Sequence, residues 1–170
     1  QQEMENLAQK AMDEGAAGLS TGLIYIPGTY SATPEIIGLA KVIQANQGIY
    51  ASHMRNEGDD VDAAIAETIN IGRLSGIPVE ISHFKVSGQK NWGVSTRTLS
   101  LVQEARKEGL DITIDQYPYT ASSTNLHVLL PTWVMAGGTD SANFRLLDPV
   151  IHEKIKAEMY GNAKKGKLKN

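Results

Sequence analysis

Short runs of β-forming residues alternate with segments of helical periodicity along most of the chain. Strands are predicted at 17–22 (AGLSTG), 49–54 (IYASHM), 79–84 (VEISHF) and 112–117 (ITIDQY). The starts of these runs are separated by 32, 30 and 33 residues. Strands that alternate with helices at this spacing are typical of βαβ units, so the pattern predicts an α/β fold with a parallel sheet.

Apolar residues at helical spacing predict helices before and between these strands. The helices are expected at about 2–14, 33–46, 60–74 and 95–108, with a later one at 149–160. Thr33 is the expected N-cap of the second helix, with Pro34 at its first position. The stretch 118–140 is rich in Ser, Thr, Pro and Gly. This composition indicates that the chain leaves the alternating pattern of strands and helices here.

The last predicted strand has a polar face. Its residues Ile112, Thr113, Ile114 and Asp115 alternate between apolar and polar, whereas a parallel strand that is buried on both faces is almost wholly apolar. We interpret this alternation as typical of a barrel strand whose inward side chains reach a polar mouth.

Composition and charge exclude several classes of function. The 170 residues include no cysteine, which excludes disulfides, thiolate zinc ligands and a thiol nucleophile, and favours a reducing, cytoplasmic setting. The net charge is −3, and the body of the chain reaches −7 without the four lysines of 163–170. An acidic body argues against nucleic-acid binding. No apolar run is long enough to predict a membrane span, and no signal-peptide pattern is present.

Two histidines occupy matching places in successive units. His53 lies in Ala-Ser-His-Met and His83 in Ile-Ser-His-Phe, each at the end of a predicted strand and 30 residues apart. If the strands are parallel neighbours in register, the imidazoles lie about 4.8 Å apart, at the edge where α/β folds place their active sites. Two neutral imidazoles there suit a transition metal, with zinc the commonest. On spacing alone, two hydrogen-bonded structural histidines remain an alternative.

Cationic and aromatic residues follow the same strand ends. Arg55 and Lys85 each lie two residues past a histidine, where a cation could hold an anionic group of a substrate. The alternative is an exposed loop charge. Tyr117 and Tyr119 flank Pro118, which stiffens the turn. They are interpreted either as hydroxyl donors to a substrate or as half-buried packing residues.

The chain resembles the D-aminoacylase (N-acyl-D-amino-acid deacylase) branch of the amidohydrolase superfamily. The resemblance covers roughly 11–138 and rests on the combination of GAAGLSTGLIYIPGTYSATPEI, IYASHMRNEG, PVEISHFKVSGQKNWG and LDITIDQYPYTASST followed by LLPTW. It implies a zinc-dependent (β/α)8 barrel that hydrolyses the amide of N-acyl-D-amino acids, giving a D-amino acid and a carboxylate.

The resemblance also implies roles for individual residues. The family's fifth-strand and sixth-strand zinc ligands match His53 and His83, and Lys85 matches the lysine that helps to hold the substrate carboxylate. Further substrate contacts are implied for Tyr117, Ser122 or Ser123, and Arg55 matches the family's His-Met-Arg pattern.

Parts of the family's catalytic set have no match here. The chain has no His-x-His pair and no cysteine ligand, and the general-base Asp of the eighth strand is expected outside it, so no catalytic residue is assigned. The four strands are therefore expected to be strands four to seven. We expect a partial barrel over 1–119, a lid-like insertion over 120–160 and a basic flexible tail over 161–170. Deacylase activity of these residues alone is expected to be negligible.

Two alternatives remain open from the sequence. One is a fragment of a dihydroorotase-like or hydantoinase-like cyclic amidase, which shares the two-histidine arrangement, although the YPYTAS and NWG strings disfavour it. The other is a non-catalytic half-barrel that self-associates through unpaired strand edges, giving dimers or aggregates.

Overall fold

The structure is a computed structural model and describes residues 1–164. Its strands are β1 (Gly18–Gly22), β2 (Ile49–His53), β3 (Val79–Ile81) and β4 (Ile112–Ile114). Its helices are α1 (Gln2–Asp13), α2 (Thr33–Ala45), α3 (Val61–Ser75), α4 (Ser95–Lys107), α5 (Thr132–Met135), α6 (Thr139–Leu147) and α7 (Pro149–Lys164). Within the described residues, no helix is both long and apolar enough to span a membrane.

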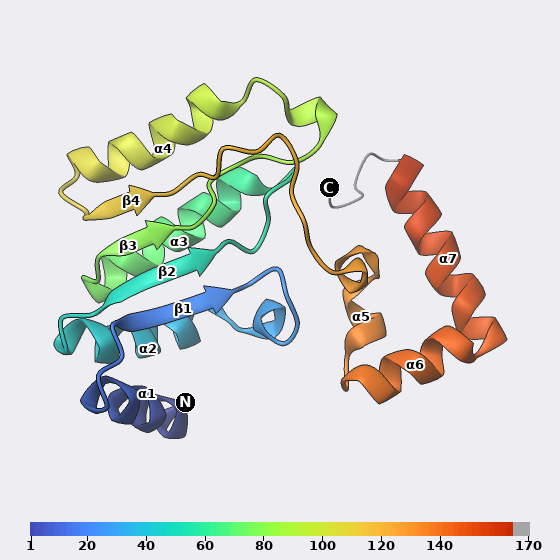
Figure 1. Cartoon of the computed structure of the whole chain (residues 1–170), viewed down its shortest axis with the longest axis horizontal. Helices are drawn as coiled ribbons and strands as arrows, with labels where there is room; N and C mark the ends of the chain where they lie inside the picture. Colours follow the sequence, from blue (N-terminus) through green and yellow to red (C-terminus); the bar gives the residue numbers. More distant parts are fainter. Residues whose placement is uncertain (165–170) are drawn as a thin grey trace.

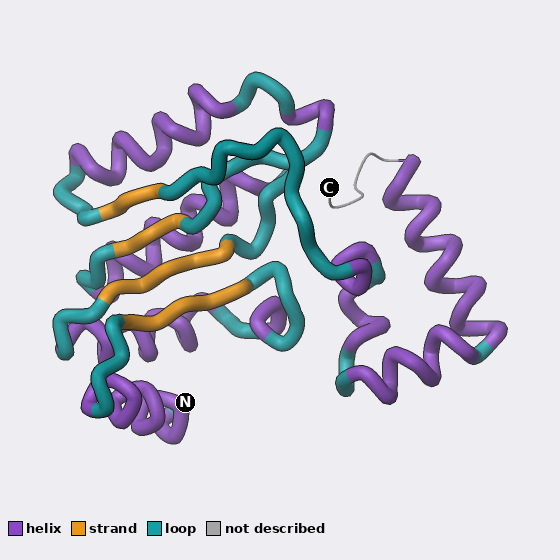
Figure 2. Tube along the Cα trace, viewed as in Figure 1, coloured by secondary structure: helices purple, strands orange, loops and turns teal. Residues whose placement is uncertain are grey.

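The four strands form one parallel sheet in sequence order, β1-β2-β3-β4 (Figures 1 and 2). Helices α2, α3 and α4 connect successive strands; α2 packs against β1 and β2, α3 against β3, and α4 against β4. The prediction of βαβ units and a parallel sheet is therefore confirmed. Parallel strands all end at the same edge of the sheet, so the loops that follow β1 to β4 meet there.

The core lies between the sheet and its helices. The strand side chains Tyr50, Val79, Ile81 and Ile112 are at most 3% exposed, and they pack with buried residues of α2, α3 and α4. Gly72 of α3 lets this helix approach β3 closely, because a Cβ there would lie only 2.7 Å from Cγ2 of Val79. A larger residue at this position would push the helix off the strand.

On β3 and β4, the opposite face of the sheet is polar. Thr113 is exposed while its neighbour Ile112 is buried, which confirms the alternation expected for the last strand. The Thr113 hydroxyl donates a hydrogen bond to Glu80 of β3 on the same face. On β3 and β4, residues of opposite parity therefore serve two surfaces, an apolar one under the helices and a polar one away from them.

The helix boundaries differ from prediction at two places. Ala32, rather than Thr33, is the N-cap of α2, because the Thr33 hydroxyl donates to Oε1 of Glu67 at 2.7 Å instead of capping the helix. Helix α7 continues to Lys164 rather than ending at 160. The predicted basic tail, 161–170, thus begins inside this helix, and 165–170 lie outside the described residues.

The chain leaves the sheet after β4 and forms a helical arm beside it (Figure 1). Helix α6 in this arm was missed by sequence reasoning; only Ala142 is buried along it, so it has little of an apolar face. Hydrogen bonds between described residues join the arm to the loop after β1. The Tyr25 and Thr124 hydroxyls are 3.2 Å apart, and Tyr30 donates to the carbonyl of Thr132 at 3.0 Å. The domain boundaries stay a prediction.

Candidate metal centre

The two histidines meet at the carboxyl edge of the sheet. Their ring centroids are 4.3 Å apart with an interplanar angle of 73°. The expected proximity is found, but the expected register is wrong. Ser52 pairs with Ile81, so the next step along the strands brings His53 level with Ser82 rather than His83. A one-residue offset would normally turn the His83 side chain to the opposite face.

A left-handed backbone at His83 corrects this offset. Its φ is +42°, a region that histidine tolerates better than most residues. Asp115, just after β4, holds this conformation: its Oδ1 accepts the backbone N–H of His83 at 2.6 Å, and its carbonyl accepts the N–H of Phe84 at 2.8 Å. The turn at His83 therefore returns the ring to the side of the sheet that His53 faces.

Glu57 is a third member of this cluster. It lies in the loop between β2 and α3, is only 8% exposed, and places Oε1 3.0 Å from Nδ1 of His83 and 4.0 Å from Nε2 of His53. Possible ligand atoms of the three residues all lie within 4.8 Å of one another. Sequence reasoning missed this role for Glu57. The available signal was an acidic residue four positions after His53, in a loop where acidic residues are commonly solvated.

The cluster has the donors that a metal ion would use. Among the described residues, Nε2 of His53 and Oε1 of Glu57 are buried and form no hydrogen bond, although Oε1 lies 3.0 Å from Nδ1 of His83. Unpaired buried polar atoms are rare and costly, and a cation bound between them would satisfy both. Two imidazole nitrogens and a carboxylate oxygen form a common donor set for Zn²⁺. The residues present therefore fit a zinc ion.

The environment keeps His53 neutral. Burial lowers the pKa of His53 to about 4; the charge of Glu57 opposes this shift, whereas His83 and Lys85 add to it. A metal ligand must be an unprotonated imidazole. At neutral pH, His53 is therefore ready to bind a metal ion without first releasing a proton.

The lowered pKa of His53 predicts acid sensitivity of the metal-free protein. In the unfolded chain this histidine protonates near pH 6.5, whereas the folded protein resists protonation until about pH 4, so stability falls as the pH drops between these values. The loss is at most about 3 kcal/mol, at about 1.4 kcal/mol per pKa unit. Urea unfolding in EDTA at pH 7, 6, 5 and 4.5 measures it. His53→Gln should flatten this dependence, and equal slopes in both proteins would contradict the assignment.

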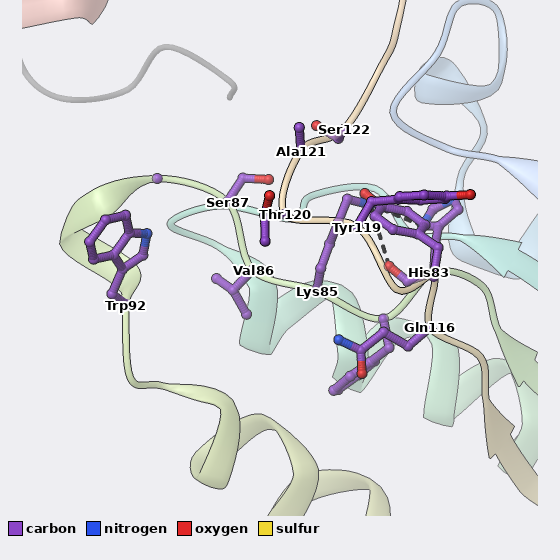
Figure 3. A pocket seen from close by; sticks show the side chains of 13 residues that line it. His83, Lys85, Val86, Ser87, Trp92, Gln116, Tyr119, Thr120, Ala121 and Ser122 are labelled. Atoms are coloured by element: carbon purple, nitrogen blue, oxygen red, sulfur yellow. Dashed lines mark hydrogen bonds between the residues drawn. The ribbon is translucent and has the colours of Figure 1, made fainter.

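Lys85 belongs to the same cluster. Its ammonium lies 2.6 Å from Oε2 of Glu57 and 3.1 Å from Nδ1 of His83. It also lies 5.5 Å from the centre of the Tyr117 ring. Figure 3 shows the Lys85 side chain beside His83, both among the residues that line a cavity, and Lys85 donates a hydrogen bond to the carbonyl of His83. The predicted anion-binding cation is thus next to the histidine pair, and in this structure it is paired with Glu57.

A small cavity joins most of the predicted site residues. It has a volume of about 160 Å³, and its lining includes His53, His83, Lys85, Tyr117, Ser122 and Ser123, together with Glu57 and Tyr25. A neighbouring cavity of about 340 Å³ extends from His83 and Lys85 towards Trp92 (Figure 3). Tyr25 was not expected in the site; its ring lies 4.7 Å from that of His53. Tyr25 follows β1 in the sequence, and this place alone could have indicated that it lies at the same edge of the sheet as the histidines.

Arg55 is not among the residues that line this cavity. Its guanidinium forms two hydrogen bonds of 2.9 Å with the carboxylate of Glu67, and it donates to the carbonyls of Thr29 and Ser31 at 2.9 Å. The hydrogen bonds to Glu67 and its negative charge raise the pKa of Arg55. Burial alone would raise the pKa of Glu67, but hydrogen bonds from Arg55 and Thr33 lower it overall. In this structure Arg55 braces the loop after β1, which carries Tyr25.

The chain is similar in sequence to known deacylases. The chain is 49% identical over 123 residues to a D-aminoacylase of Alcaligenes xylosoxydans xylosoxydans, covering 72% of this chain and 25% of that protein. It is 43% identical over 131 residues to an N-acyl-D-glutamate deacylase of the same organism, covering 77% and 26%. No family model matches the chain.

The fold agrees with a solved structure. The N-acyl-D-glutamate deacylase of Bordetella bronchiseptica, complexed with zinc and a phosphonate inhibitor that mimics the tetrahedral intermediate, matches with a TM-score of 0.68 and 42% identity. The match covers 69% of this chain and 25% of that one. The chain is therefore a homologue of the D-aminoacylases and N-acyl-D-glutamate deacylases, and it spans about a quarter of the length of these relatives.

Proposed function

We propose that this chain supplies part of the metal site and part of the substrate site of a zinc-dependent deacylase that hydrolyses N-acyl-D-amino acids. The observation that carries the proposal is the convergence of His53, His83 and Glu57 at the carboxyl edge of the sheet. The named relatives, one of which was solved with zinc, support this reading. They also favour it over a cyclic amidase.

We also propose that the sheet is a segment of a (β/α)8 barrel. Four parallel strands in sequence order, joined by helices that pack against them, are the arrangement that such a barrel repeats. By family resemblance, these are strands four to seven. The edge at which the histidines meet then corresponds to the catalytic mouth of the barrel.

The residues around the histidine pair suit a carboxylate-bearing substrate. Zinc, when bound, would lower the pKa of a water ligand and polarise the amide carbonyl. The Lys85 ammonium is positioned to pair with the carboxylate of an N-acyl amino acid. The hydroxyls of Tyr117 and of Ser122 or Ser123 lie around the same cavity and can donate to that carboxylate or to the acyl oxygen. The general base is expected outside this chain, as the family resemblance implies.

Transplantation into a relative tests this function. The segment of this chain that aligns with the D-aminoacylase of A. xylosoxydans xylosoxydans would replace the matching segment of that enzyme. The chimera is expected to deacylate N-acetyl-D-amino acids, with little activity on the L-enantiomers. The same chimera with His83→Ala is expected to lose activity by at least about 1,000-fold, as for loss of a central catalytic group. A folded, zinc-loaded chimera without deacylase activity would contradict the proposal.

The 170-residue chain is the matched control for this experiment. It is expected to show no deacylation above that of the buffer, because it provides neither the general base nor the remaining metal ligands that the resemblance implies. Turnover by the purified, homogeneous chain at a rate close to that of the chimera would show that the catalytic set is different from the one proposed.

A further inference from the structure

One carboxylate in the cluster faces two cation positions. Oε1 of Glu57 points to the histidine nitrogens, at 3.0 and 4.0 Å, while Oε2 lies 2.6 Å from the Lys85 ammonium. We propose that Glu57 couples a metal ion at His53 and His83 to a small carboxylate anion at Lys85, so that each strengthens the binding of the other. This inference rests on the metal site of the proposed function and adds a link between that site and the substrate anion.

The first step is competition between two cations. Without an anion, Lys85 is the nearest charge to Glu57, and it also lies 3.1 Å from Nδ1 of His83. A divalent ion among the same atoms would be repelled by the ammonium and would share the carboxylate with it. Because Glu57 is only 8% exposed, solvent screens these interactions weakly. Lys85 therefore opposes metal binding while it is held by Glu57.

The second step is release of Lys85 by an anion. The Lys85 ammonium lies over the ring of Tyr117 and at the junction of the two cavities, so it can meet a carboxylate that enters from either one. An anion there gives the ammonium a new partner and adds negative charge beside the metal position. Glu57 is then free to bind the metal ion more fully. Thermodynamic linkage requires that the metal ion raise the anion affinity by the same factor.

The coupling predicts that removing the two charges of the Glu57–Lys85 ion pair, one at a time, changes zinc affinity in opposite directions. Glu57→Gln keeps the shape of the side chain and removes its charge, and it should lower zinc affinity by about 10–100-fold. Lys85→Met removes the competing cation, and it should raise zinc affinity by several fold. If Lys85 merely positioned Glu57 for the metal ion, both substitutions would lower the affinity.

Calorimetric titration of the 170-residue chain with zinc chloride tests this proposal, in acetate or in perchlorate at equal ionic strength. Acetate should raise the zinc affinity of the unmodified chain by about fivefold or more, the lower end of typical site–site coupling. It should have little effect in Glu57→Gln or Lys85→Met. Matched controls are Glu80→Gln, a carboxylate on β3, and Lys90→Met, which loses an ion pair with Asp59; both should keep the acetate effect.

Each outcome separates the coupling from the metal site itself. Zinc binding with no acetate effect, or with lower affinity in Lys85→Met, would overturn the coupling and leave the metal site standing. An acetate effect that persists in Lys85→Met would mean that acetate binds the zinc directly, which also overturns it. No zinc binding by the folded chain in either buffer would overturn the coupling, and the zinc content and activity of the chimera would then decide the proposed function. If Glu57→Gln fails to fold, Lys85→Met and the acetate comparison still decide the question.

Discussion

The double variant His53→Ala/His83→Ala is expected to lose zinc binding, with an affinity at least about 100-fold weaker than that of the unmodified chain. Changing residues that only support metal ligands already lowers affinity by about 10–100-fold, and this variant removes both imidazoles that converge at the sheet edge. Glu57 and the backbone remain, but one carboxylate beside the Lys85 ammonium cannot hold the ion. Calorimetry at pH 7.5 measures the effect.

The chain provides a matched control for this variant. His127 and His152 are its other two histidines, and neither belongs to the cluster at the sheet edge. The variant His127→Ala/His152→Ala should bind zinc as the unmodified chain does, with one ion per chain. If the two double variants lose affinity equally, the zinc is bound elsewhere on the surface and the assignment of the site is wrong.

Arg55→Met is expected to destabilise the protein by about 3 kcal/mol. The substitution removes two hydrogen bonds to Glu67 and two to loop carbonyls. The Glu67 side chain is only 12% exposed, and its carboxylate then keeps the hydrogen bond from the Thr33 hydroxyl. Breaking one side of a buried ion pair typically costs about 3–5 kcal/mol, and the partial exposure of Arg55 places this pair at the lower end. Urea unfolding at pH 7.5 measures the loss.

Two further variants show whether the uncompensated charge causes this loss. Arg55→Met/Glu67→Leu removes both charges and should recover part of the stability. Arg97→Met breaks an exposed pair with Asp62, and it should cost less than about 1 kcal/mol. If the free energy of unfolding of Arg55→Met is within about 0.5 kcal/mol of that of the unmodified chain, this network does not stabilise the loop after β1.

The fold was predictable where short-range patterns determine it. The repeat of strands and helices, the parallel order and the polar face of the last strand all follow from hydrophobic periodicity. Helix α6 was not predictable in this way, because the arm buries little of it and its apolar residue Phe144 is 66% exposed. Thr33 was a reasonable N-cap from local preference, but its hydroxyl is bound to Glu67, which is distant in the sequence.

The candidate site was also predictable only in part. The spacing of His53 and His83 predicted that the two rings would meet, although the strand register alone would have turned His83 away. The positive φ that restores the contact depends on Asp115, which lies 32 residues further along the chain, so the sequence gives no local sign of it. The burial of Glu57 and the pairing of Arg55 with Glu67 also arise from tertiary packing. Residue type and spacing indicated the chemistry, and packing decides which polar residues take part.

X-ray absorption spectroscopy of the chain loaded with one equivalent of zinc tests the central claim most directly. The account predicts two imidazole nitrogens at about 2.0–2.1 Å and oxygen ligands at about 2.0–2.2 Å. The imidazole scattering should disappear in His53→Ala/His83→Ala and persist in His127→Ala/His152→Ala. A zinc shell made only of oxygen atoms in the unmodified chain, or imidazole scattering that survives the loss of His53 and His83, would contradict a metal centre at this edge of the sheet.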